Sequence, residues 1–433
     1  MTALPPRLLP DSAVVGEDGW LTIGGCSLQD LAAEFGTPVL VYDEEHLRNR
    51  CREAVAAFGA GNVVYATKAF LCRAMARLAH DEGLRLDVAT GGELHIALAA
   101  GVPPASLVLH GNNKSVDELR RAVTEGVGRI VVDSFDELDR LDALHAAGTG
   151  PAPSVLIRVT PGVHAHTHEF ISTGQDDSKF GFNLANGDAL RAVRRAETSP
   201  GVELVGVHCH IGSNVFAASS FAKAIEVMAG FAAPLGLPEL VVGGGLGVAY
   251  VETEEAPTIT QWGHVVRDAC ASLGVTADVS VEPGRSIVAG AAVTVYTLGT
   301  IKPIPGVRTY WAVDGGMSDN PRPVLYGSGY EAFLPRAPFA ERTASGRLVG
   351  KHCESGDVLL FEARLPSDVA VGDLVATPVT GAYSRSMGSN YNSITRPPVV
   401  FARDGDARLV IRRETFDDLL ATDLHEVSDT SWS

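Results

Sequence analysis

Reactive side chains stand at or near the ends of several short apolar segments that have the composition of buried strands. These residues are Lys68, Asp87, His210, Ser213, Glu282 and Arg285. In a partly buried site the amine of Lys68 could form an imine with an aldehyde, because burial lowers the pKa of a lysine. The alternative is an ordinary surface lysine just past a strand, and Lys68 alone does not distinguish the two.

A glycine-rich turn and a serine on another strand end have the composition of a phosphate site. The sequence GGGLG begins with Gly243, Gly244 and Gly245, directly after the apolar segment ELVV. Small residues let backbone N–H groups close around a phosphate, and Ser213 in HIGS adds a hydroxyl. A tight turn without a ligand is the alternative for GGGLG by itself, but two neighbouring donor loops favour a phosphate.

Three further side chains could hold an aromatic ring and a substrate. The flat imidazole of His210 could stack on a ring, and Glu282 could keep a pyridine nitrogen protonated. Arg285 could bind a carboxylate, although a structural ion pair is the simpler explanation of the EPGR segment. With Lys68 for the aldehyde, these residues describe a site for pyridoxal 5′-phosphate. A lysine that forms an imine with the substrate itself, as in an aldolase, is the alternative without a cofactor.

Two sets of histidines could instead indicate a metal. His208 and His210 alternate along one segment and therefore point the same way, and His164, His166 and His168 recur in a polar segment. A zinc site needs three or more ligands at suitable spacing, and neither set has an obvious further ligand. We therefore expect no metal site, and we expect a long polar loop over residues 161–183.

Strands and helices alternate through the first two thirds of the chain. Strands are predicted over residues 63–68, 85–90, 106–111, 129–134, 154–160, 203–212, 239–245 and 278–284. The segments between them have apolar residues at helical spacing, and several end in glycine. Eight parallel strands joined by helices predict a closed (β/α)8 TIM barrel, whose carboxyl strand ends carry the active site. An open doubly wound sheet is the alternative.

The pattern changes near residue 285. The later segments lack long helical spacers and are interrupted by Gly, Pro and Asp, which is typical of an antiparallel sheet. The early segment GWLTIGG also has the composition of a strand, and it could join this second unit. We therefore predict a barrel domain over residues 36–285 and a β-rich domain formed by residues 1–35 and 286–433.

The composition is that of a soluble globular protein with an acidic balance. The chain has 35 Lys and Arg residues against 52 Asp and Glu residues, which gives a net charge of −17. Such a charge repels nucleic acid and anionic membranes, so we expect neither as a partner. We see no export signal and no membrane span, and the six scattered cysteines favour reduced thiols and the cytoplasm.

Six motifs in a fixed order resemble the diaminopimelate decarboxylases, which belong to the alanine-racemase-like (fold type III) pyridoxal phosphate enzymes. The motifs are YATKAF, HCHIGSN, GGGLG, EPGRS, CESGDVL and GAYSRSMGSNYN, and the similarity extends from about residue 20 to 420. The resemblance implies decarboxylation of meso-2,6-diaminopimelate to L-lysine and CO2, the last step of lysine biosynthesis. It also implies a homodimer in which the CES segment completes the active site of the other subunit.

The resemblance gives a role to each matching residue. Lys68 would bind the aldehyde of the cofactor, and Cys353 would donate a proton. The residues implied to hold pyridoxal 5′-phosphate are Lys68, Asp87, His210, Ser213, Gly243, Gly244, Gly245, Glu282, Gly284, Arg285 and Tyr383. The residues implied to bind the substrate are Arg285, Arg322, Tyr326, Glu354 and Tyr383.

The choice of substrate depends on the second amino-acid head of diaminopimelate. That head needs cations for its carboxylate and an acid for its ammonium, which Arg285, Arg322 and Glu354 could supply. Two residues depart from the common pattern, namely Phe70 and the added Arg385. The alternatives are a related decarboxylase for ornithine, arginine or a specialised substrate, an alanine racemase, and a cofactor carrier without catalysis.

Overall fold

Eight parallel strands form a ring in the first two thirds of the chain. The computed structural model describes residues 3–163 and 177–424. The strands of the ring are β5 (Val64–Ala66), β6 (Arg85–Val88), β7 (Leu107–Leu109), β8 (Arg129–Val132), β9 (Ser154–Thr160), β11 (Glu203–Cys209), β12 (Glu239–Val241) and β13 (Asp278–Ser280). A parallel bridge between Val63 and Val281 joins the first strand to the last and closes the ring. The predicted (β/α)8 barrel is confirmed, and the open-sheet alternative is wrong.

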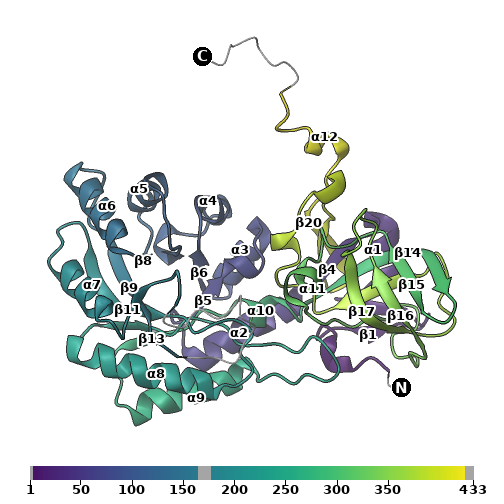
Figure 1. Ribbon diagram of the computed structural model, residues 1–433, viewed down its shortest axis with the longest axis horizontal. Helices are drawn as coiled ribbons and strands as arrows, with labels where there is room; N and C mark the ends of the chain where they lie inside the picture. Colours follow the sequence, from purple (N-terminus) through teal and green to yellow (C-terminus); the bar gives the residue numbers. More distant parts are fainter. Residues whose placement is uncertain (1–2, 164–176, 425–433) are drawn as a thin grey trace.

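Helices cover the outside of this ring (Figure 1). They are α2 (Glu44–Phe58), α3 (Arg73–Asp81), α4 (Gly91–Ala99), α5 (Val116–Glu125), α6 (Phe135–Ala146), α7 (Asp188–Glu197), α8 (Ser219–Ala232), α9 (Ile259–Ser272) and the short α10 (Arg285–Val288). Several begin at a capping side chain, as α5 does, where Ser115 and Glu118 satisfy each other's backbone N–H groups. A cap of this kind contributes about 1 kcal/mol, and it fixes where the strand-end loop stops.

The interior of the ring is packed with small apolar side chains. Val64, Val108, Val131, Leu156 and Val241 form a cluster that is separate from the larger core. These residues come from five different strands, and side chains from opposite sides of a ring meet only if they point inward. The filled interior leaves the strand ends and their loops as the place for a ligand.

A mostly antiparallel sheet forms the second unit, on the right of Figure 1. Its strand order is β17 (Val358–Leu365), β16 (Ala344–Val349), β15 (Arg308–Val313), β14 (Ala292–Ile304), β4 (Val39–Asp43), β19 (Val399–Arg403) and β20 (Asp406–Ile411), with β18 (Leu374–Pro378) paired to β14. The pairs β15–β16 and β4–β19 are parallel. The predicted β-rich region after the barrel is thus confirmed.

Three short strands near the N-terminus form a small sheet of their own. They are β1 (Val14–Val15), β2 (Leu21–Ile23) and β3 (Cys26–Ser27). The N–H of Leu21 donates to the carbonyl of Pro335 at 2.8 Å, and the N–H of Gly405 donates to the carbonyl of Gly24 at 2.7 Å. The N-terminal segment is therefore attached to the second unit, as the sequence predicts.

Strand β4 lies within the range that the sequence predicts for the barrel, yet it pairs with β14 and β19 of the second sheet. All five of its residues are buried, because both faces of the strand are covered. An apolar run of this kind has the same composition as a barrel strand, so the sequence does not show which sheet it joins. We propose that the barrel domain begins after Asp43 and ends near residue 285, as the sequence predicts for its end.

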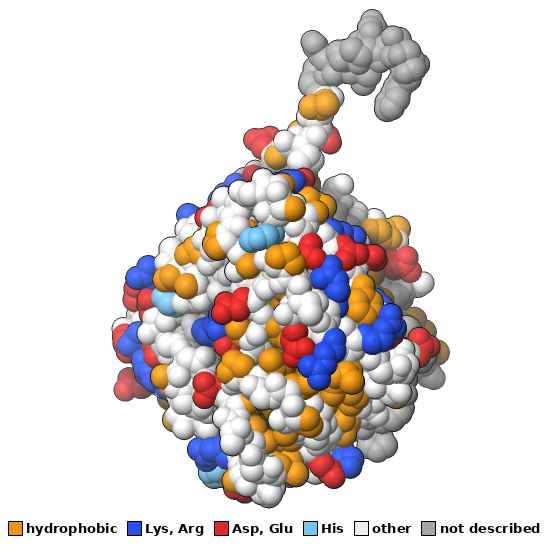
Figure 2. Space-filling model, turned by 90° about the vertical axis from the view of Figure 1, so that its left-hand side faces the viewer, with side chains coloured by type: hydrophobic (Ala, Val, Ile, Leu, Met, Phe, Trp, Pro, Cys, Tyr) orange, Lys and Arg blue, Asp and Glu red, His pale blue; other side chains and the backbone are white. Residues whose placement is uncertain are grey.

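The barrel face shown in Figure 2 carries acidic and basic side chains intermixed with hydrophobic ones. All six cysteines are free thiols, and Cys353 is the one that is exposed. Among the helices of residues 3–163 and 177–424, none has both the length and the apolar character needed to cross a bilayer.

Candidate active site

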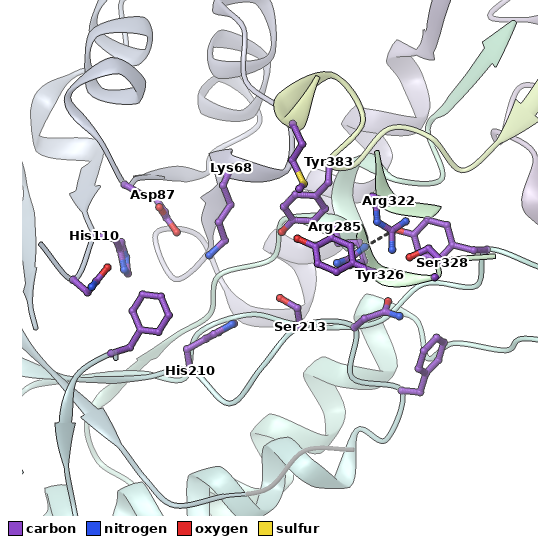
Figure 3. A pocket seen from close by; sticks show the side chains of 18 of the residues that line it. Lys68, Asp87, His110, His210, Ser213, Arg285, Arg322, Tyr326, Ser328 and Tyr383 are labelled. Carbon is purple, nitrogen blue, oxygen red and sulfur yellow. Dashed lines mark hydrogen bonds between the residues drawn. The ribbon is translucent and has the colours of Figure 1, made fainter. Parts of the chain in front are cut away.

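A cavity of about 950 Å³ lies where the carboxyl ends of the barrel strands face the second unit. Figure 3 shows Lys68 reaching into its middle, with Asp87 and His110 on one side and Arg285 and Arg322 on the other. We call these two sides the Asp87 end and the arginine end. The predicted site residues that line the cavity are Lys68, Asp87, His210, Ser213, Arg285, Arg322, Tyr326 and Tyr383.

Lys68 is positioned by the turn that follows β5. It lies in a short 3-10 helix, Thr67–Ala69, whose Thr67 hydroxyl donates to the backbone carbonyl of Asp87 at 2.7 Å. The N–H of Tyr383 donates to the carbonyl of Ala69 at 2.8 Å. These bonds tie the strand end to β6 and to the second unit. The side chain of Lys68 is exposed to the cavity, so its amine is open to a ligand.

The charge of Lys68 differs from the sequence-based expectation. Burial on its own lowers the pKa of the amine, but attraction to Asp87, with smaller contributions from Tyr383 and Glu282, raises the pKa above its ordinary value of 10.5. Burial thus acts in the expected direction, but the expected net lowering of this pKa is not found, because the attraction to nearby charges outweighs it. The reason is that carboxylates from other strands lie near the amine, which spacing along the chain does not show.

We expect Asp87→Asn to make Lys68 more reactive near neutral pH in the cofactor-free protein. Only the neutral amine is a nucleophile, and removing the carboxylate lowers the pKa of Lys68. The rate of acetylation of Lys68, followed by peptide mass spectrometry over a pH series, should show a midpoint at lower pH. Asp81→Asn, at an exposed site on α3, should leave the midpoint unchanged. An unchanged midpoint in Asp87→Asn would show that Asp87 does not set this charge.

The glycine turn after β12 packs against the loop that carries Ser213. The N–H of Val215 donates to the carbonyl of Gly245 at 2.8 Å, which joins the two loops. Gly245 has a φ of +112°, and a Cβ at this position would overlap the carbonyl oxygen of Gly212. A side chain is therefore incompatible with this close approach. Ser213 lines the cavity, whereas Gly243, Gly244 and Gly245 do not.

Glu282 is buried between two histidines after β13. His208 Nε2 lies 3.0 Å from Oε2 of Glu282, and His110 Nε2 lies 3.1 Å from Oε1. Burial favours the neutral acid, but the two histidines hold the pKa of Glu282 well below its ordinary value. The ring nitrogens and the carboxylate lie within 4.8 Å of one another. Because both imidazoles face the carboxylate, we interpret the group as an ion-pair cluster.

His210 faces the cavity as a neutral ring. Burial, followed by repulsion from Lys68 and Arg158, holds the pKa of His210 well below its ordinary value. Arg158 comes from inside β9, contacts Asp133 at 3.5 Å and lies over the ring of Phe180 at 4.4 Å. A neutral imidazole beside cations is suited to stacking on an aromatic ligand rather than to ion pairing.

The arginine end of the cavity contains two buried guanidinium groups. Arg285 donates to the hydroxyl of Tyr250 at 2.5 Å and lies over the ring of Tyr383 at 4.8 Å. Arg322 donates to the hydroxyl of Tyr330 at 2.6 Å and lies over the ring of Tyr250 at 4.1 Å. Within residues 3–163 and 177–424, neither arginine has a carboxylate in ion-pair contact. Two buried cations without an anion favour an anionic ligand at this end.

Cys353 and Glu354 do not line this cavity. They lie in the connection between β16 and β17, and both are exposed. The connection is held by Asp357, whose carboxylate accepts the N–H of His352 at 2.9 Å and the N–H of Met317 at 2.7 Å. The structure therefore presents a thiol and a carboxylate on an anchored surface loop, outside the cavity of the same chain.

The remaining predicted positions have structural surroundings. A Cβ on Gly284 would lie 2.9 Å from Ala66, so this glycine permits close packing beside β5. Phe70 is fully buried and its ring stacks on Tyr42 at 4.6 Å, which explains an aromatic residue there. Arg385 is half-buried outside the cavity wall, and nothing in the structure explains it.

Part of the long polar loop falls outside the described residues. This holds for residues 164–176, and therefore for His164, His166 and His168. At the end of the loop, the N–H of Gly181 donates to Asp133.

Several cavity residues are absent from the sequence-based prediction, and His110, Arg158 and Tyr250 are the ones that contact its charged groups. His110 follows β7 directly, so its strand-end position could have identified it. Arg158 lies within β9, and its inward direction depends on the register of the barrel. Tyr250 comes just after GGGLG, and its contact with both arginines appears only in three dimensions.

Comparisons with known proteins agree with this geometry. The chain matches the family described as pyridoxal-dependent decarboxylase, pyridoxal binding domain, over residues 44–289. It is 47% identical over 437 residues to diaminopimelate decarboxylase from Corynebacterium efficiens, covering 97% of this chain and 95% of the relative. For the same enzyme from Mycobacterium tuberculosis the identity is 46% over 441 residues, covering 97% and 98%. The crystal structure of diaminopimelate decarboxylase from M. jannaschii with L-lysine gives a TM-score of 0.88 at 32% identity, covering 96% of this chain and 98% of that one.

Proposed function

The chain belongs to the diaminopimelate decarboxylases, a family of pyridoxal-dependent decarboxylases, and from this premise we propose that it converts meso-2,6-diaminopimelate to L-lysine and CO2. The observation that carries the proposal is the arrangement of the cavity. The amine of Lys68 lies between a cluster with an ionised Glu282 and two buried arginines. A dicarboxylic amino acid with a second amino-acid head matches that distribution of charge.

The residues around Lys68 fit pyridoxal 5′-phosphate. Lys68 offers an amine for the aldehyde, His210 a neutral ring for stacking, and Ser213 a hydroxyl for the phosphate. Glu282 is an anion able to hold a proton on the ring nitrogen. When bound, the cofactor supplies the electron sink that makes loss of CO2 from an amino acid feasible. The other residues that we propose for cofactor binding are Asp87, Gly243, Gly244, Gly245, Gly284, Arg285 and Tyr383.

The arginine end supplies the contacts that would choose the substrate. Arg285 and Arg322 donate to tyrosine hydroxyls rather than to carboxylates, so both can also donate to a substrate carboxylate. Tyr326 lines the same end, and Glu354 is the acid proposed for the distal ammonium. A site that pairs buried charges rejects analogues without the partner group, because its own charges would stay unpaired.

We assign to Cys353 the donation of the proton that replaces the lost carboxylate. A thiol can return a proton to carbon if it reaches the reacting atom. Cys353 and Glu354 lie outside the cavity of their own chain. We therefore propose a homodimer in which each subunit places this pair in the cavity of the other. The same arrangement brings Glu354 to the arginine end.

We place the protein in the cytoplasm. The support is chemical, since six free cysteines suit a reducing compartment.

The test of the proposed function is turnover of a set of amino acids by the cofactor-loaded protein. With meso-2,6-diaminopimelate we expect lysine and CO2 in equal amounts. Ornithine, arginine and lysine should react at least about 10²-fold more slowly, since they lack the distal carboxylate that the arginines bind. Turnover of ornithine or arginine faster than that of meso-2,6-diaminopimelate would contradict the proposed substrate. Racemisation of alanine would contradict the proposed reaction.

A further inference from the structure

The carboxylate of Glu282 is contacted at both oxygens by histidines, and the two contacts differ. His208 makes a hydrogen bond to Oε2 at 3.0 Å. His110 Nε2 lies 3.1 Å from Oε1, at ion-pair distance but without the alignment of a hydrogen bond. The two rings meet edge to face at 5.1 Å. The contact of His208 is therefore the better formed of the two.

The two histidines also differ in their position relative to the cavity. His110 lines the cavity, whereas His208 and Glu282 do not. Figure 3 shows His110 beside Asp87 at the Asp87 end. His110 is therefore the member of this cluster that lines the cavity, and its Nε2 lies at Oε1 of Glu282. The contact of His110 with Glu282 is thus the one that an arriving ring nitrogen would meet.

The charges around His110 favour a bound proton in the cofactor-free protein. The groups that face it are Asp87 after β6, Glu282 after β13, Arg158 from β9 and His208 from β11. Burial lowers the pKa of His110, but the two carboxylates outweigh burial and Arg158 and raise it above 6.5. The pKa of His208 is instead lowered, because burial outweighs the attraction to Glu282. The charges of the cluster therefore favour a proton on His110 over one on His208, beside an ionised Glu282.

We propose that His110 is a positioning residue that occupies Oε1 of Glu282 before the cofactor binds and releases its proton when a protonated ring nitrogen takes that place. This inference rests on the proposed function, because it requires a pyridine ring at the Asp87 end. The proton leaves Nε2 of His110, no covalent bond between heavy atoms changes, and the net charge of the cluster is kept. Glu282 is held as an anion in both states.

The proposal predicts a difference in proton release on ligand binding. The probe is pyridoxine 5′-phosphate, whose alcohol cannot react with Lys68, added to the cofactor-free full-length protein in the presence of a chelator. Titration calorimetry at pH 6.5 in buffers of different ionisation enthalpy gives the number of protons exchanged. Wild type should release more protons than His110→Asn, by between about half a proton and one, because a group whose pKa lies above the working pH is more than half protonated before the ligand binds. The protonation of the free ligand is the same in both experiments and cancels from the difference. His145→Asn, at an exposed site on α6, should match wild type.

A ligand without the ring nitrogen separates this role from a purely structural one. With the 1-deaza analogue, which has a carbon at that position, wild type and His110→Asn should exchange the same number of protons. Equal exchange with pyridoxine 5′-phosphate itself would overturn the inference about His110. A wild-type protein that binds no pyridoxine 5′-phosphate would instead overturn the proposed function.

A second measurement does not depend on the fold of the His110 variant. In the cofactor-free protein, NMR titration of the His110 imidazole should give a midpoint above 6.5 in wild type and a lower one in Glu282→Gln. Saturation with pyridoxine 5′-phosphate should also lower the midpoint in wild type. A midpoint that neither change moves would contradict the pairing of His110 with Glu282.

Discussion

Lys68→Ala is expected to abolish decarboxylation, with turnover of meso-2,6-diaminopimelate falling by about 10⁴-fold or more. The variant removes the amine that stands in the middle of the cavity. Without it the aldehyde has no covalent partner in the protein, so the visible absorption of the bound cofactor should also disappear. The measurements are lysine formed per subunit and the absorption spectrum after gel filtration.

The matched control for this prediction is Lys223→Ala, an exposed lysine of α8 that pairs with Glu226 at 2.8 Å. It should keep both the spectrum and the turnover of wild type. In wild type, borohydride should reduce the imine between Lys68 and the cofactor to a stable amine. The absorption band should then disappear, and the cofactor should remain attached, as a covalent label, to the peptide that contains Lys68. Full activity of Lys68→Ala, or a label on another lysine, would contradict the role given to this amine.

The barrel could be predicted because its strands are apolar runs bounded by loops and helices. Strand β9 was expected at 154–160 and spans Ser154–Thr160, and the other seven strands were expected within a few residues. Strand β5 is shorter than expected because Thr67 and Lys68 turn away into a 3-10 helix. The predicted strands also place Lys68 and Asp87 at the same end of the barrel, since the carboxyl ends of parallel strands lie together.

Properties that depend on contacts between distant strands could not be predicted. The pKa of Lys68 follows from Asp87 and Glu282, whose distances to the amine are set by the closed ring. The pairing of His110 with Glu282 joins β7 to β13, which lie on different parts of the ring. A run such as β4 fits either sheet, because burial on both faces gives the same composition in each.

Cys353→Ala is expected to keep the cofactor and to slow turnover by about 10² to 10⁴-fold, the range for loss of a general acid. The residue is exposed on the anchored loop between β16 and β17, so its removal leaves no cavity in a core. The absorption of the bound cofactor should therefore equal that of wild type. Cys270→Ala, in helix α9, is the control and should keep full activity. Loss of cofactor with normal turnover of the bound fraction would instead make Cys353 a structural residue.

Mixing two impaired variants tests whether Cys353 acts across the subunit boundary. Lys68→Ala lacks the amine and Cys353→Ala lacks the thiol, so each variant alone should turn over at about 1% of the wild-type rate or less. If the thiol serves the partner's cavity, a mixed dimer contains one cavity with both groups intact. Random pairing should then restore about a quarter of wild-type turnover. If Cys353 served the cavity of its own chain, both cavities of the mixed dimer would be defective. Activity that stays at the level of the separate variants after subunit exchange would therefore contradict the shared site.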